Sequence, residues 1–142
     1  MDQETRRRLE EVLDREIEVA HSLAETLAAE RAALTGDSPD AVEQKAAEKI
    51  QILGTMEKLD AERRHLWATP GLGLAATTAD RWRALMELMA GCRTANEVNG
   101  HIIHVRQHQI GQLIDIVRGG PAVTYSPQGK PFAKALRALA RA

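Results

Sequence analysis

A chain of 142 residues has room for one domain, or for one domain and a tail, and its formal net charge of -1 gives no general attraction to nucleic acid. Aromatic residues make up only 3%, and apolar positions filled mainly by Leu, Ile, Ala and Met favour helices over strands. No 18-residue apolar run and no signal-peptide layout is present, which argues against membrane insertion. A single cysteine excludes an internal disulfide and suits a reducing compartment. We therefore expect a soluble, cytoplasmic, all-α protein.

The first predicted helix spans residues 4–34. Four of its apolar residues are seven apart, which is the heptad spacing of a coiled-coil seam: Leu13, Ala20, Leu27 and Leu34. Gly36 then predicts the end of this helix, and Ser38-Pro39 predicts the N-cap and the first residue of the next one. Because the connection is short, we expect the next helix to lie antiparallel to the first.

The second predicted helix spans residues 39–67 and forms a long antiparallel hairpin with the first. Its apolar stripe is densest in the second half. The first half is rich in alanine and places Lys45 and Lys49 close to the stripe. We therefore predict weaker packing for the first half of this helix.

Residues 69–79 interrupt the helical pattern with a proline and two glycines, and they are not strongly polar. We predict a loop that lies against the helices, followed by a capping box formed by Thr77 and Asp80. Trp82 falls in the first turn of the helix after this loop. We interpret Trp67 and Trp82 as plugs at one end of the bundle.

The longest predicted helix spans residues 80–117, and the rest of the chain is organised around it. It contains no proline, and at about 100° per residue its apolar residues cover a face roughly 140–180° wide. At 1.5 Å per residue the helix would be about 57 Å long, so it needs partners along its length from this chain or from another. The apolar residues of this face are Leu85, Leu88, Met89, Cys92, Ala95, Ile102, Ile103, Ile110, Leu113, Ile116 and Val117.

Three polar residues, Asn96, Asn99 and Arg106, fall within that apolar face. A buried amide or guanidinium without a partner costs about 1–3 kcal/mol or more, so each must be paired, lie at the bundle edge or await a ligand. Two interpretations stay open: these residues set the register of a helical bundle, or they bind a partner. Gly100 costs about 1 kcal/mol in mid-helix relative to alanine, and such a glycine often allows close approach to the backbone.

The chain changes character after Val117, where a Gly-Gly-Pro sequence ends the helical pattern. We divide the chain into a helical bundle domain of residues 1–118 and a flexible basic tail of residues 119–142. The spacing of Phe132, Leu136 and Leu139 predicts a short amphipathic helix in the tail. The tail holds four of the 19 basic residues and no acidic one, so 15 basic and 20 acidic residues remain in the bundle domain, a net charge of -5 there.

His101, His104 and His108 have the spacing of a metal-binding motif, but they fall on the helix side opposite the apolar face. Cys92 lies within that face, where a small buried hydrophobic residue is the default. No phosphate-binding loop, nucleophile elbow or pair of catalytic carboxylates is recognisable. We therefore expect no catalytic residue, no metal site, no cofactor and no enzymatic activity.

Three pieces of the sequence resemble one family in order along the chain. The first piece ends the first predicted helix, the second lies in the second helix, and the third and most specific lies in the long helix. The pieces are Glu30-x-x-Ala33-Leu34, then Lys49-x-x-Ile52-Leu53-x-x-Met56-x-x-Leu59-x-x-x-Arg63, then Asn96-x-x-Asn99-Gly100-x-Ile102-Ile103, followed by Tyr125 and Gly129 in the tail. In these pieces the chain resembles flagellar export chaperones of the FlgN family.

The resemblance implies a non-enzymatic type III export chaperone of bacterial flagellum biogenesis. Members of the family hold the C-terminal amphipathic helices of hook-filament junction proteins, prevent premature assembly and deliver them to the export apparatus. The resemblance thus implies the junction proteins, the export gate and the export ATPase complex as partners, and it allows a homodimer. Tyr125 would then contact the export gate. The expected partner-binding residues are Asn96, Asn99, Gly100, Ile103, Arg106, Ile110, Leu113 and Tyr125.

Two other classes of function remain open from the sequence. A structural coiled-coil assembly adaptor or stalk component would use the same heptads for permanent packing. A metal- or ligand-binding helical-bundle enzyme is suggested by the histidines alone. The irregular loop and the basic tail favour the chaperone, because a permanent coiled coil needs neither.

Overall fold

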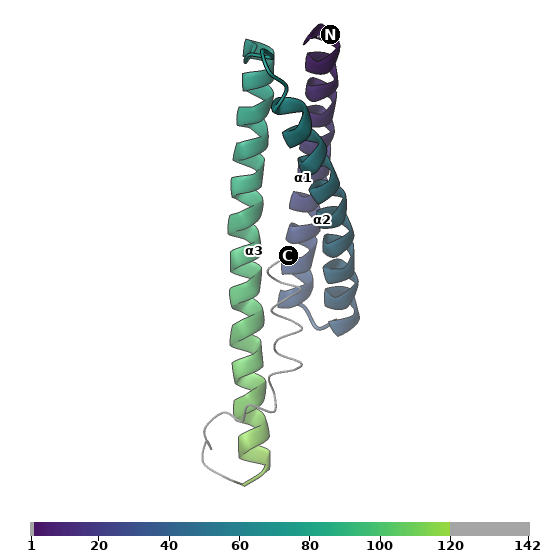
Figure 1. The fold of residues 1–142 in the computed structure, drawn as a ribbon. Helices are drawn as coiled ribbons and strands as arrows, with labels where there is room; N and C mark the ends of the chain where they lie inside the picture. The colour runs from purple at the N-terminus through teal and green to yellow at the C-terminus, as the bar shows by residue number, and fades with distance from the viewer. Residues whose placement is uncertain (1, 120–142) are drawn as a thin grey trace.

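The computed structural model describes residues 2–119, which form three helices and no strand within that range. These are α1 (Asp2–Thr35), α2 (Pro39–Trp67) and α3 (Ala76–Val117). Helices α1 and α3 run in the same direction and α2 runs opposite to both (Figure 1). Helix α1 packs against both of the others, whereas the backbones of α2 and α3 stay farther apart. The predicted all-α fold, a long antiparallel hairpin with a third long helix, is confirmed.

Within residues 2–119, the core consists of three apolar clusters that follow one another along α1. The first lies near the N-terminal end of α1, the second lies halfway along it, and the third lies where α1 turns into α2. Their buried residues are Leu9, Leu13, Ala20, Met56, Leu72 and Leu85 in the first, Leu23, Leu27 and Cys92 in the second, and Leu34 and Ile103 in the third. The predicted heptad residues of α1 are all buried among them.

The turn between α1 and α2 follows the prediction from the sequence. Helix α1 ends at Thr35, and the Ser38 hydroxyl caps α2 by accepting a hydrogen bond from the Ala41 amide at 3.3 Å. Pro39 is the first residue of α2, where its missing N–H costs nothing. Three residues therefore reverse the chain and place α2 antiparallel to α1.

The predicted capping box at the start of α3 is wrong. The helix begins at Ala76, its N-cap is Ala75, and no side chain of the described residues caps it. Thr77 lies inside the first turn, and its hydroxyl instead donates to the Glu10 carboxylate of α1 at 2.7 Å. Because α3 begins at Ala76, Thr77 is not at the N-cap position, and its hydroxyl instead joins α3 to α1 through a hydrogen bond to a charged acceptor.

The connection between α2 and α3 lies against the helices, as predicted. The Leu72 side chain is buried in the first core cluster, and the Arg6 guanidinium donates to the Leu72 carbonyl at 2.6 Å. Trp67 and Trp82 meet edge to face with ring centroids 5.2 Å apart, and the Arg63 guanidinium lies 4.7 Å from the Trp82 ring. The interpretation of both tryptophans as plugs at one end of the bundle is confirmed.

The division of the chain at residue 118 remains a prediction. Apart from Gly119, the predicted tail lies outside the described residues. In the part that the structure describes, no helix combines the length and the apolar character needed to cross a membrane.

Candidate partner-binding surface

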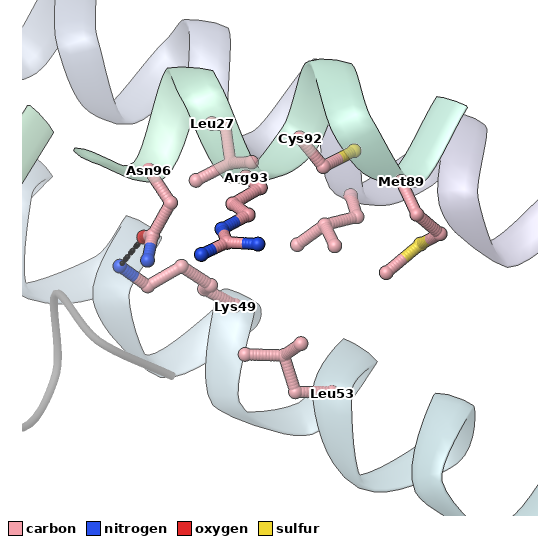
Figure 2. Close-up of a pocket in the computed structure, with 8 residues that line it drawn as sticks. Leu27, Lys49, Leu53, Met89, Cys92, Arg93 and Asn96 are labelled. Carbon is pink, nitrogen blue, oxygen red and sulfur yellow. Dashed lines mark hydrogen bonds between the residues drawn. The ribbon is translucent and has the colours of Figure 1, made fainter. Parts of the chain in front are cut away.

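Four polar side chains meet at the centre of the bundle and connect all three helices. The Lys49 ammonium of α2 lies 3.1 Å from a carboxylate oxygen of Glu30 in α1, and both side chains are only 1% exposed. Lys49 also donates to the Asn96 amide oxygen at 3.1 Å, as the dashed line in Figure 2 shows. Asn99 donates to Glu30 at 2.8 Å and to the Leu27 carbonyl at 2.9 Å. We call these four residues the central polar cluster.

The central polar cluster explains why a lysine can lie in the core. A buried ammonium or carboxylate is costly unless it is paired and its hydrogen-bonding groups are occupied. Here Glu30 neutralises Lys49, and the two asparagines supply further hydrogen bonds. The prediction of weak packing in the first half of α2 is therefore wrong for Lys49 and for Ala46, which are both buried. The sequence shows the lysine near the stripe but not the glutamate that faces it.

A pocket of about 160 Å³ opens between α2 and α3 beside the central polar cluster. Figure 2 shows its floor on α1 and its two walls on α2 and α3. The lining is mostly apolar, with Arg93, Lys49 and Asn96 as its polar members. The residues that line it are Leu23, Leu27, Lys49, Leu53, Met89, Cys92, Arg93 and Asn96.

Cys92 is buried beside this pocket, as predicted for a small hydrophobic residue. Its thiol donates to the Ala20 carbonyl at a sulfur–oxygen distance of 3.6 Å. Burial raises the pKa of the Cys92 thiol above its ordinary value, so the neutral form is favoured. A neutral, buried thiol is poorly suited to nucleophilic chemistry.

A second buried carboxylate, Glu16, lies nearer the N-terminal end of α1. Glu16 accepts a hydrogen bond from the Arg63 guanidinium at 3.0 Å, and Arg63 also pairs with Asp60. Burial raises the pKa of Glu16, and the charge and hydrogen bond of Arg63 offset only part of that effect. Together with the central polar cluster, this pair fixes the register of α2 against α1.

Helix α3 continues past the end of the hairpin (Figure 1). Ile103 packs against Leu34 in the third core cluster, and Arg106 donates to the Gly36 carbonyl of the α1–α2 turn at 3.2 Å. From Ile103 to Val117 the helix extends for about 21 Å at 1.5 Å per residue. The exposed large apolar residues of this stretch are Val105, Ile110, Leu113, Ile114, Ile116 and Val117.

Four of these exposed residues continue the face that α3 turns towards α1. At 100° per residue, Ile110, Leu113, Ile114 and Val117 all lie within about 80° of Ile103 around the helix axis. We call these four residues the distal face of α3. Leu113, for example, is 61% exposed, whereas Ile103 on the same side of the helix is 7% exposed. The difference arises because α1 ends at Thr35 and leaves the rest of this face uncovered.

The residues predicted to bind a partner lie in three different environments. Asn99 and Ile103 are buried in the bundle, Asn96 is half-buried in the lining of the pocket, and Gly100 is half-buried. Arg106, Ile110 and Leu113 are exposed at or beyond the hairpin turn, and Tyr125 lies outside the described residues. Ile114 is not among the predicted residues, although its spacing of four from Ile110 places it on the same face.

The three histidines predicted to lie on the outer side of α3 are all exposed. Among residues 2–119, no three His, Cys, Asp or Glu side chains are grouped so that they could hold a metal ion. The distal face and most of the pocket lining are apolar contact surface.

The family described as FlgN protein matches residues 1–131. The chain belongs to the FlgN family. Searches of curated proteins and of solved structures gave no match. FlgN proteins are flagellar export chaperones, not enzymes. The resemblance found in the sequence is therefore confirmed. The structure also shows where the polar residues of the three motif pieces lie. Glu30, Lys49, Asn96 and Asn99, taken from all three pieces, form the central polar cluster.

Proposed function

We propose that this FlgN-family protein is a cytoplasmic chaperone that binds the C-terminal amphipathic helices of hook-filament junction proteins and delivers them to the flagellar export apparatus. The single observation that carries the binding mode is the exposed distal face of α3. Large contiguous apolar surface on a soluble protein is a common sign of a protein-binding site. An amphipathic helix that lays its apolar side on such a face would bury both surfaces.

The packing of α1 supports a specific position for the bound helix. Along the first part of α3, helix α1 covers the face that carries Asn99 and Ile103. A partner helix on the distal face would occupy the equivalent position beyond the α1–α2 turn, at the usual interaxial distance of about 8–10 Å. Arg106 lies at the junction, where its guanidinium already reaches the Gly36 carbonyl. Asn99 and Ile103 then support the surface from inside the bundle.

The binding mode is tested with a fluorescent peptide that carries the C-terminal helix of a junction protein. Leu113→Asp should weaken binding of this peptide by at least about tenfold, because a central apolar anchor is replaced by a charge. Gln112→Asp is the matched control, since residue 112 is exposed on the opposite side of the same turn and should leave the affinity unchanged. If wild type and Leu113→Asp bound the peptide with equal affinity, the distal face would not be the binding site.

Delivery to the export gate is assigned to Tyr125 by the family resemblance. An aromatic ring buries a large area at a low entropy cost, and Tyr125 is the only tyrosine of the chain. Tyr125→Ala should leave binding of the junction-protein helix within a few-fold, yet reduce binding to the cytoplasmic domain of the gate and lower export. Loss of junction-protein binding in this variant would instead make Tyr125 part of the substrate site.

A further inference from the structure

We infer that residues 132–142 of this chain pack on the distal face of α3 when no partner is bound, and so compete with the partner helix. The distal face is the apolar surface that the hairpin leaves uncovered. Phe132, Leu136 and Leu139 recur at steps of four and three, the spacing that places apolar residues on one side of a helix. The chain thus carries an apolar helix face and a matching segment within 25 residues of each other.

The uncovered part of α3 is long enough to hold a helix of residues 132–142. The uncovered part of α3 extends for about 21 Å beyond Ile103, and a helix of residues 132–142 would be about 16 Å long. Helix α3 ends at Val117 and is followed by Gly119, which has a positive φ and whose amide donates to the Ile116 carbonyl at 3.1 Å. Such a glycine ends a helix and turns the chain away from the axis. The 14 residues 118–131 can span at most about 45 Å, far more than a return to the distal face requires.

The charges favour one orientation. If the segment runs antiparallel to α3, Arg137 and Arg141 come to lie beside the α1–α2 turn. Three carboxylates are exposed at that turn, from Asp37, Asp40 and Glu43. None of the three forms an ion pair with another residue of the described range 2–119. A basic segment beside these acidic residues gains attraction that a neutral one would lack.

The family match ends at residue 131, so the segment lies outside the part of the chain that matches the family. Occupation of the distal face by this segment does not depend on the proposed function. Only the competition with a junction-protein helix rests on it. A tethered competitor acts at an effective concentration of about millimolar, so a partner helix must bind well to displace it. The segment would therefore reject weak apolar partners and keep the distal face out of water.

The occupation is tested in the full chain with a fluorescent synthetic peptide of residues 128–142 as the probe. The variant Leu136→Asp/Leu139→Asp removes the apolar side of the tethered segment and should free the distal face. The probe should then bind this variant at least about tenfold more tightly than it binds wild type, where the tethered segment competes. Ala138→Asp adds a charge away from the apolar side and should behave as wild type. Adding Leu113→Asp to the tail variant should abolish binding of the probe.

Hydrogen–deuterium exchange gives a second readout that needs no ligand. Residues 105–117 should exchange several-fold more slowly in wild type and Ala138→Asp than in Leu136→Asp/Leu139→Asp. Equal exchange in all three proteins, or equal probe binding to wild type and the tail variant, would overturn the inference. Protection that rises with protein concentration would assign the face to a second copy and would also overturn it. If the occupation is shown and a junction-protein peptide binds none of the proteins, the proposed function fails while this inference stands.

Discussion

Lys49 of α2 and Glu30 of α1 form an ion pair of 3.1 Å in the middle of the bundle, with side chains that are 1% exposed. Neither charge would be stable in this position alone, because the free-energy cost of removing an ion from water exceeds the stabilisation gained by packing its side chain. Asn96 and Asn99 of α3 complete the cluster through hydrogen bonds to Lys49 and Glu30. The pair therefore holds α3 against the α1–α2 hairpin as well as joining α1 to α2.

Removing one charge of this pair should be strongly destabilising. Lys49→Met keeps the length of the side chain but leaves the Glu30 carboxylate buried without a countercharge. We expect the free energy of unfolding to fall by about 3–5 kcal/mol. The measurement is urea unfolding at neutral pH, followed by far-UV circular dichroism.

The double variant Glu30→Leu/Lys49→Met should recover at least about 2 kcal/mol of that loss, because an apolar pair needs no countercharge. Arg93→Met is a control for simple loss of a cation. Arg93 pairs with Glu97, both side chains are exposed, and loss of this cation should cost about 0.5 kcal/mol or less. If the double variant were no more stable than Lys49→Met, the buried charge would not be the cause.

The helices and their order could be predicted from the sequence because heptad spacing and the Ser38-Pro39 cap are local features. The start of α3 was misplaced for the same reason. The threonine that resembles a capping residue is bonded to Glu10, and that bond depends on a helix more than 60 residues away along the chain. Local patterns do not contain such contacts.

The candidate site was predictable only in part. Ile103 and Ile110 are indistinguishable on a helical wheel, yet one is buried and the other exposed. The difference depends on the axial position of α1 beside α3, which is set by the loop that carries the buried Leu72 and by the contact between Leu34 and Ile103. The pairing of Glu30 with Lys49 likewise depends on how α1 and α2 are aligned along their axes, which no local sequence pattern specifies.

The pH dependence of stability should carry a contribution from Glu16. Burial raises the pKa of this carboxyl above its ordinary value of 4.5, so the folded protein keeps the proton to a higher pH than the unfolded chain. The stabilisation from protonated Glu16 is fully present below the unfolded pKa and is lost as the pH rises through the folded pKa. The stability of wild type relative to Glu16→Gln should therefore fall as the pH rises from 4.5 upwards.

Glu16→Gln is the reference because glutamine keeps the shape of the side chain and an acceptor for Arg63 but does not titrate. Urea unfolding of both proteins across a pH series gives the difference directly, and groups that titrate alike in both proteins cancel. A difference that grows with pH would mean that attraction to Arg63 outweighs burial, which is the opposite sign.

Cys92 should react slowly with a thiol reagent in the native protein. The residue is 4% exposed, and burial raises its thiol pKa, so both access and thiolate formation are limited. We expect reaction with dithionitrobenzoate at pH 8 to be on the order of 100-fold slower than in urea-unfolded protein, since labelling must await local opening. In Cys92→Ala/Thr94→Cys, the new thiol lies on the exposed side of the same helix and should react as fast as a free thiol. Comparable rates for the two native proteins would contradict the burial of Cys92.

Two substitutions on the same face of α3 should distinguish its core part from its distal part. Ile103→Asp places a charge in the third core cluster beside Leu34, and the free energy of unfolding should fall by about 3 kcal/mol or more. Leu113→Asp changes a side chain that is 61% exposed and should alter stability by only about 0.5 kcal/mol or less. Both variants should lose the junction-protein helix, the first because the bundle is unstable and the second with the bundle intact. Thermal unfolding and peptide binding, measured on the same samples, distinguish the two causes. A collapse of the melting temperature in Leu113→Asp would place Leu113 in the folded core and leave the distal face without a role in binding.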